Sequence, residues 1–257
     1  MIDLHVHVLP GIDDGPRDEA AAIDLVAEAV ATGVTTIAAT PHLRADHPAV
    51  RPLELAARTA RLQAALDSAG IAVELVGGGE VDVRWAQQAG EDELKAVSYG
   101  GRGRDVLTEV PYGELMPQFE DFVFRLRALG YRVLLAHPER SPTFQRDVDR
   151  LLALVGQGCL VQVTASALAS RTRGSRSRKL AIALVREGIA HVIASDTHRS
   201  GGDRASLADA VEALRRDAPL RAHWMVTEAP AAILAGEPLP PAPAERSRRI
   251  TFEPRRG

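Results

Sequence analysis

The stretch HVHVLPGIDDG, residues 5–15, joins a strand pattern to polar side chains that an ordinary strand does not need. Side chains alternate between the two faces of a strand, so His5 and His7 point to the same side. Neutral imidazole is a common metal ligand. The stretch therefore predicts a strand whose end carries two ligands, followed by a glycine-rich turn that contains Asp13 and Asp14.

Strand-like and helix-like segments alternate along the rest of the chain. Further strands are expected at residues 34–42, 71–81, 104–111, 132–139, 159–165 and 190–198, and helices at 17–33, 50–70, 118–130, 179–188 and 203–217, the last of these closing the regular part. This alternation predicts an α/β fold with a mostly parallel sheet and right-handed crossovers. Seven such units favour a closed or nearly closed barrel, although the pattern alone also allows a flat sheet.

The length and composition indicate one domain. The 257 residues suit a single barrel, and 46% hydrophobic with 25% charged residues is ordinary for a globular protein. Pro and Arg then become frequent, so we expect a domain over residues 1–235 and a loosely held tail over 236–257, with one short strand at 249–252.

Several classes of partner and location are disfavoured by the same composition. A net charge of −3 supplies no general basic field for nucleic acid. Cys159 is the single cysteine, which rules out an internal disulfide and favours a reducing compartment. The N-terminus lacks a secretory pattern, and no run of about 20 apolar residues is present to span a bilayer. We expect a cytoplasmic protein without membrane insertion.

The ends of six predicted strands carry a histidine or an acidic residue. These residues are His5 and His7, His42, Glu80, Glu109, His137, and Asp196 with His198. Parallel α/β barrels build their active sites at this rim. A lone histidine there is more often structural, and a lone glutamate is more often a cap or a solvated charge. Because all of them fall at the same rim, we predict a multinuclear metal site.

The motifs HVHVLPGIDDG, TTIAATPH, GGGEV, TEVP, LLAHPER, VQVTA and ASDTH, in this order, resemble the PHP (polymerase and histidinol phosphatase) superfamily. LPGIDDG together with HPER is similar to its bacterial manganese-dependent protein-tyrosine phosphatase branch, which acts in capsule and exopolysaccharide systems. The resemblance covers residues 1 to about 235. It implies a distorted (β/α)7, TIM-like barrel that holds three metal ions.

The resemblance also implies a set of site residues. His5, His7, Glu80 and Asp196 would hold one ion; Glu80, Glu109 and His137 a second; Asp14, His42 and His198 a third. The expected metal is Mn²⁺, with Zn²⁺ or Fe possible. Arg140 and Arg204 match arginines that contact the phosphate in this branch. Asp13 is interpreted either as an orienter of the site or as a plain turn residue.

The function that this resemblance implies is hydrolysis of phosphate monoesters by a metal-bound hydroxide. The expected substrate is a phosphotyrosine protein, a tyrosine kinase tail in bacterial exopolysaccharide or capsule synthesis. The alternatives are a PHP phosphatase for a small metabolite such as histidinol phosphate, and a non-catalytic, metal-stabilised binding module. The Arg-rich stretch 170–179 is interpreted as a solvated loop or as a contact patch for such a partner.

Two other hydrolase chemistries fit less well. Amidohydrolases often use a modified lysine on the fourth strand, but the only lysines are Lys95 and Lys179, away from predicted strand ends. Cysteine-dependent phosphatases need Arg six residues after the nucleophile, and Ala165 occupies that position after Cys159. We therefore expect Cys159 to be a buried core thiol.

Overall fold

The strands of this protein run parallel to their neighbours and form two hydrogen-bonded groups. The computed structural model describes residues 1–170, 172, 175–201 and 205–245. The strands are β1 (Ile2–Val6), β2 (Thr36–Ala39), β3 (His42–Leu43), β4 (Glu74–Gly77), β5 (Glu80–Val81), β6 (Asp105–Glu109), β7 (Arg132–Ala136), β8 (Leu160–Thr164) and β9 (Val192–Ala194). One group has the order β1-β2-β4 and the other β3-β5-β6-β7-β8-β9. The predicted α/β class with parallel strands is confirmed.

The two groups meet where two long strands are interrupted. β2 and β3 are separated by Thr40 and Pro41, and β4 and β5 by Gly78 and Gly79. A Cβ on Gly79 would lie 2.3 Å from the Leu43 side chain, so this break needs glycine. Each interrupted pair corresponds to one strand expected from the sequence, and each contributes to both groups.

The last strand returns to the first. The amide of Asp196 donates to His5 O at 2.8 Å, and the amide of His7 donates to Thr197 O at 2.9 Å. A parallel bridge between Val6 and Thr197 accompanies these bonds. The strands of the described residues therefore follow one another in ring order, as in a barrel, and their carboxyl ends face a common rim.

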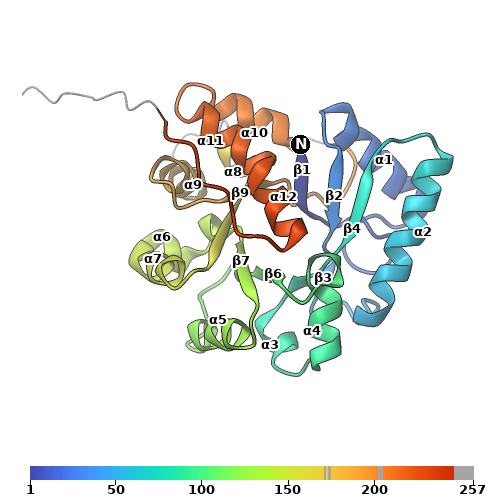
Figure 1. Cartoon of the computed structure of the whole chain (residues 1–257), viewed down its shortest axis with the longest axis horizontal. Coiled ribbons are helices and arrows are strands. Elements are labelled where there is room, and N and C mark those ends of the chain that lie inside the picture. The colour runs from blue at the N-terminus through green and yellow to red at the C-terminus, as the bar shows by residue number, and fades with distance from the viewer. Residues whose placement is uncertain (171, 173–174, 202–204, 246–257) are drawn as a thin grey trace, which may run out of the picture.

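Helices surround these strands (Figure 1). They are α1 (Glu19–Ala31), α2 (Leu55–Ser68), α3 (Val83–Ala86), α4 (Glu91–Val97), α5 (Phe119–Ala128), α6 (Pro142–Arg146), α7 (Val148–Gly156), α8 (Ala165–Ala169), α9 (Arg176–Arg186), α10 (Leu207–Leu214), α11 (Pro219–Val226) and α12 (Glu228–Ala235), with 3-10 turns η1 (Pro52–Glu54), η2 (Tyr99–Gly101) and η3 (Pro138–Arg140). Helix α1 begins at a sequence-encoded cap, because the Asp18 side chain accepts a hydrogen bond from Ala21 N.

Alternate residues of strands β2, β6, β7 and β9 enter two different hydrophobic cores. On β7, Val133 and Leu135 pack in the outer core beneath the helices, whereas Leu134 and Ala136 belong to an inner cluster. The inner cluster consists of Leu4, Ala38, Tyr99, Leu107, Leu134, Ala136, Leu160, Val192, Ala194 and Ile233. The Tyr99 hydroxyl donates to Leu4 O at 2.9 Å, so even the polar atom of this cluster is satisfied.

The C-terminal region differs from the sequence-based expectation. The regular part does not close near residue 217, because α11 and α12 follow, and α12 places Ile233 in the inner cluster. The beginning of the tail is also not loosely held, since Leu239 packs on the core and Glu245 accepts from Arg221 N at 2.7 Å. The strand expected at 249–252 lies outside the described residues. No helix in the described part of the chain combines the length and apolarity needed to cross a membrane.

Candidate metal centre

Strand β1 and the residue after it carry His5 and His7, the two histidines nearest the N-terminus. Its register against β2 shifts between Asp3 and Val6, and His5 and His7 both face the rim with their Nε2 atoms 3.2 Å apart. The Nδ1 atom of His5 donates to Gln162 Oε1 at 3.0 Å. This hydrogen bond fixes the tautomer and leaves Nε2 as a free ligand atom.

The turn after β1 orients the second histidine. His7 Nδ1 donates to Asp13 Oδ2 at 2.9 Å, and the same oxygen accepts from the amide of His42 at 3.1 Å. The other oxygen of Asp13 accepts from Gly15 N at 3.0 Å. A Cβ on Gly15 would lie 2.4 Å from His7 O, so only glycine allows the turn to fold this closely over the strand. Asp13 thus both orients the His7 imidazole and stabilises the turn.

Glu80 lies at the centre of the cluster and is fully buried. Its Oε2 is 2.9 Å from His42 Nδ1, 3.4 Å from His5 Nε2 and 3.5 Å from His7 Nε2. Its Oε1 is 2.9 Å from His137 Nε2. Four imidazoles from three different parts of the chain therefore meet on one carboxylate.

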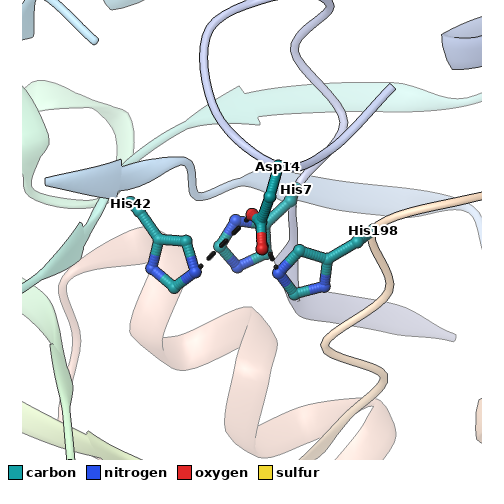
Figure 2. A group of neighbouring side chains, drawn as sticks. All are labelled: His7, Asp14, His42 and His198. Carbon is teal, nitrogen blue, oxygen red and sulfur yellow. Dashed lines mark ion pairs between the residues drawn. The ribbon is translucent and has the colours of Figure 1, made fainter. Parts of the chain in front are cut away.

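Asp14 occupies the outer side of the same cluster. Figure 2 shows its carboxylate between His42 and His198, with His7 behind. Asp14 Oδ1 lies 3.4 Å from His198 Nε2 and 3.7 Å from His42 Nε2. His198 Nδ1 donates to Asp196 O at 3.0 Å, so this histidine also directs its Nε2 atom into the cluster.

All nine residues expected as ligands fall into overlapping groups. In each group one ligand atom per residue lies within 4.8 Å of the others: His7, Asp14, His42 and His198; His5, His137 and Asp196; His5, His7 and Glu80; His42, Glu80 and Glu109. This division differs in detail from the one implied by the resemblance. His137 groups with His5 and Asp196, whereas Glu109 groups with His42 and Glu80.

Two of these residues have an unusual backbone. Among the described residues other than glycine, only His137 and Asp196 have a positive φ, at 38° and 54°. His137 directly follows the end of β7, and Asp196 lies two residues after the end of β9. His and Asp tolerate this left-handed region better than most residues, and such conformations concentrate at functional sites. The turn aims both side chains into the cluster.

The electrostatics of the cluster favour a bound cation. Burial disfavours the charged form of His7, but Asp13 and Glu80 outweigh it and raise the pKa of His7 to about 10. Burial and then the neighbouring Glu80 raise the pKa of Glu109. Burial opposes ionisation of Asp196, yet His5, His137 and Arg140 lower its pKa to about 2. A metal ion would replace the proton on His7 Nε2 and relieve the repulsion between the carboxylates.

Unpaired polar atoms provide a direct test of whether a metal fits. Among the described residues, Glu80 Oε2, Glu109 Oε2, His42 Nδ1 and His137 Nδ1 are buried without a hydrogen-bond partner. His42 Nδ1 and Glu80 Oε2 lie only 2.9 Å apart but lack hydrogen-bond geometry. Buried polar atoms rarely remain unpaired, and two ligands of one ion adopt this kind of contact. The mixed carboxylate and imidazole donors fit divalent cations.

Arg140 reaches the cluster from η3, whereas Arg204 lies outside the described residues. The Nη1 atom of Arg140 donates to Asp196 Oδ2 and, at 2.5 Å, to the Tyr112 hydroxyl. Its Nη2 atom donates to Ser166 Oγ at 3.3 Å. Three acceptors on different elements hold this guanidinium beside the metal ligands. Of the Arg-rich stretch, Arg171 and Arg173 are likewise outside the described residues.

Sequence reasoning missed several neighbours of the cluster. Gln162 interrupts the mostly apolar strand CLVQVTA, and this buried amide was the available signal. Arg44 donates to Glu109 Oε1 at 3.0 Å and leaves Oε2 free for a ligand. Tyr112 stacks on His137, with ring centroids 5.1 Å apart. Arg44 and Tyr112 lie in loops, where no periodic pattern marks them.

The fold and the site together define a parallel α/β protein with a candidate multinuclear metal centre at the carboxyl ends of its strands. The chain belongs to the family described as capsular polysaccharide synthesis, CpsB/CapC, whose sequence model matches residues 1–234.

Named relatives extend this result. The chain is 27% identical to the tyrosine-protein phosphatase YwqE of Bacillus subtilis over 98% of its own length and 100% of that protein. It is 30% identical to the putative tyrosine-protein phosphatase CapC of Staphylococcus aureus over 77% of each chain.

Solved structures agree with the sequence matches. A crystal structure from work on YwqE of B. subtilis and CpsB of Streptococcus pneumoniae, described as unique metal-dependent tyrosine phosphatases, superimposes with a TM-score of 0.82 at 28% identity. It covers 96% of this chain and all of that one. A β-aspartyl dipeptidase from Fervidobacterium islandicum shares only the fold, with a TM-score of 0.55 at 14% identity.

Proposed function

We propose that this protein is a metal-dependent protein-tyrosine phosphatase. The observation that carries the proposal is the convergence of nine His, Asp and Glu side chains on one buried cluster that leaves ligand atoms unpaired. The proposal gains support from relatives of nearly equal length that are named tyrosine-protein phosphatases.

The cluster would hold Mn²⁺, with Zn²⁺ or Fe as other possible occupants. Its proposed ligands are His5, His7, Asp14, His42, Glu80, Glu109, His137, Asp196 and His198. Divalent ions bound there would supply Lewis-acid activation of a water molecule and would neutralise charge on the phosphoryl group.

The protein's own groups position these ligands and the substrate. Gln162 and Asp13 keep the Nε2 atoms of His5 and His7 free by accepting from their Nδ1 atoms. Arg140 is fixed beside the cluster and would bind non-bridging phosphate oxygens, with Arg204 proposed as its partner. Such preorganised charge is the largest expected contribution to phosphate ester hydrolysis.

The proposed substrate is the phosphorylated tail of a tyrosine kinase in bacterial capsule or exopolysaccharide synthesis. The family description names that process, and the named relatives act on phosphotyrosine. We also propose a cytoplasmic location, which suits the buried and unpaired thiol of Cys159.

A substrate panel tests the proposal. Purified protein loaded with Mn²⁺ is assayed on a phosphotyrosine peptide, an aryl phosphate and histidinol phosphate. Hydrolysis of the first two at comparable efficiency is expected. Hydrolysis of histidinol phosphate alone would favour the metabolite phosphatase, and no hydrolysis with retained metal would favour a binding module.

Inhibitors separate metal chemistry from thiol chemistry. A strong chelator should abolish activity, which Mn²⁺ should restore. Iodoacetamide should have no effect, because Cys159 is 1% exposed and burial raises its pKa to about 11. Inactivation by iodoacetamide together with resistance to the chelator would contradict the proposal.

A further inference from the structure

Tyr112 stands at the mouth of the metal centre without a place in the mechanism above. It lies in the loop after β6, three residues beyond Glu109. Its ring stacks on that of His137 at an interplanar angle of 22°, and its hydroxyl accepts a hydrogen bond from Arg140 at 2.5 Å. Tyr112 nevertheless remains 52% exposed. An aromatic ring anchored at two points and half open to solvent is suited to meet another group.

The position of this ring is defined relative to the proposed phosphate site. Arg140 also donates to Asp196, so its guanidinium lies between the metal ligands and the Tyr112 hydroxyl. A phosphate held by Arg140 beside the cluster would direct its ester group outward, because the cluster itself is buried. Because Tyr112 contacts both His137 and Arg140 and is half exposed, its ring would border that outward path.

We propose that Tyr112 is a specificity-determining residue whose exposed ring stacks on the aryl group of the substrate. This inference rests on the proposed phosphatase function and names the chemical class that the mouth selects, aryl phosphate esters over alkyl ones. Offset or edge-to-face contact between two aromatic rings favours binding by a few-fold to about tenfold, and an alkyl ester gains none of this.

Two variants separate the ring from the hydroxyl. Tyr112→Phe keeps the ring and removes the acceptor for Arg140, whereas Tyr112→Leu removes both. If the ring selects the substrate, Tyr112→Phe keeps the preference for aryl esters and changes turnover of aryl and alkyl esters alike. Phe124→Leu on α5 is the matched control, because Phe124 is an aromatic residue 61% exposed and outside the site.

The experiment measures binding and turnover in excess Mn²⁺, with metal content determined for each variant. Dissociation constants from calorimetric titration are compared for the inhibitors phenylphosphonate and methylphosphonate, and kcat/KM for p-nitrophenyl phosphate and glycerol phosphate. Tyr112→Leu should weaken phenylphosphonate about three- to tenfold with little change for methylphosphonate. Tyr112→Phe and Phe124→Leu should keep the wild-type ratio of the two inhibitors.

An unchanged ratio of the two inhibitor constants in Tyr112→Leu would overturn the proposal. Tyr112 would then only support Arg140. The proposed function fails by a different result, the absence of phosphate monoester hydrolysis by the wild-type protein. The inhibitor ratio still decides the role of Tyr112 in that case, because it is a binding measurement.

Discussion

The inner cluster and the metal centre lie on the same strands, but the first is apolar and closely packed whereas the second is polar and has unpaired ligand atoms. On β6, Leu107 belongs to the inner cluster and Glu109, two residues further on, belongs to the metal centre. On β8, Leu160 belongs to the inner cluster and Gln162, two residues further on, accepts a hydrogen bond from the metal-centre residue His5. In the inner cluster the chain is apolar, whereas at the rim it has left-handed backbone and buried atoms without partners. One layer is satisfied by packing alone, and the other needs a ligand.

This difference separates stability from function along a single strand. The apolar layer stabilises the fold whether or not metal is present, because its contacts are complete. The rim contains five carboxylates, Asp13, Asp14, Glu80, Glu109 and Asp196, close to the two guanidinium groups of Arg44 and Arg140. Such a layer is costly to fold empty and is stabilised by cations.

The largest expected effect follows from changing the central carboxylate of the rim. Glu80→Gln should lower activity by about a thousandfold or more and should reduce metal content, because four imidazoles meet on this group. Metal analysis and kcat measure both effects. The control is Glu74→Gln on β4, an exposed carboxylate. Full metal content and activity in Glu80→Gln would contradict the role of Glu80 as a shared ligand.

A change in the apolar layer should act on stability instead. Leu134→Ala should lower the free energy of unfolding by about 2–5 kcal/mol, because Leu134 is 1% exposed and leaves a cavity. Metal affinity should remain that of the wild type. Urea unfolding with chelator present measures the first quantity and calorimetric titration the second. Leu129→Ala, at a residue 58% exposed, should change stability by less than about 0.5 kcal/mol. A loss of metal affinity in Leu134→Ala would show that the apolar layer also determines metal binding.

Gln162 lies between the apolar layer and the metal ligands, and its replacement tests whether a residue that binds no metal itself affects metal affinity. Gln162→Leu should weaken metal binding about 10- to 100-fold, because His5 loses the acceptor that fixes its tautomer. Competition with a fluorescent chelator gives the affinity without reference to activity. The control is Gln63→Leu on α2, which removes a similarly bonded amide that accepts from Leu75 N and donates to Val73 O. Equal metal affinities in the two variants would show that Gln162 is only structural.

The smallest effect concerns His191, a histidine outside the metal centre. Its Nδ1 accepts from Val161 N at 3.1 Å, and burial, followed by Arg132 and Arg221, lowers its pKa to about 4. An unfolded histidine titrates near 6.5, so the unfolded chain binds an extra proton between pH 6.5 and 4. Stability should therefore fall by about 2 kcal/mol as the pH drops from 7.5 to 5.

His191→Gln isolates that contribution, because glutamine keeps an acceptor but does not titrate. Urea unfolding of metal-free wild type and variant at pH 7.5 and pH 5 gives the comparison. The wild type should lose more stability than the variant between the two pH values. Equal losses would mean that the imidazole is protonated as easily in the folded protein as in the unfolded chain.

The strand order and much of the rim could be predicted because they depend on short-range signals. Alternation within "LLAH" and "LTEV" indicates which side chains share a face, and the carboxyl ends of parallel strands meet at one rim. The helices α3, α4, α6, α7, α8, α11 and α12 were not predicted. All of these except α7 have eight residues or fewer, so their periodicity is too short to be read and packing decides them. Helix α7 has a clear amphipathic pattern, which was the available signal.

The sequence by itself determined the chemistry of the protein: which donors it carries, where they fall along the strands and which turns contain glycine. The tertiary structure decided how those donors are shared, with His137 beside Asp196 and His5, Arg140 beside Tyr112, and the end of β9 hydrogen-bonded to β1. The physical reason is distance along the chain. Local steric and periodic rules act over a few residues, whereas these contacts join segments 28 to 191 residues apart and form only when the whole ring of strands packs.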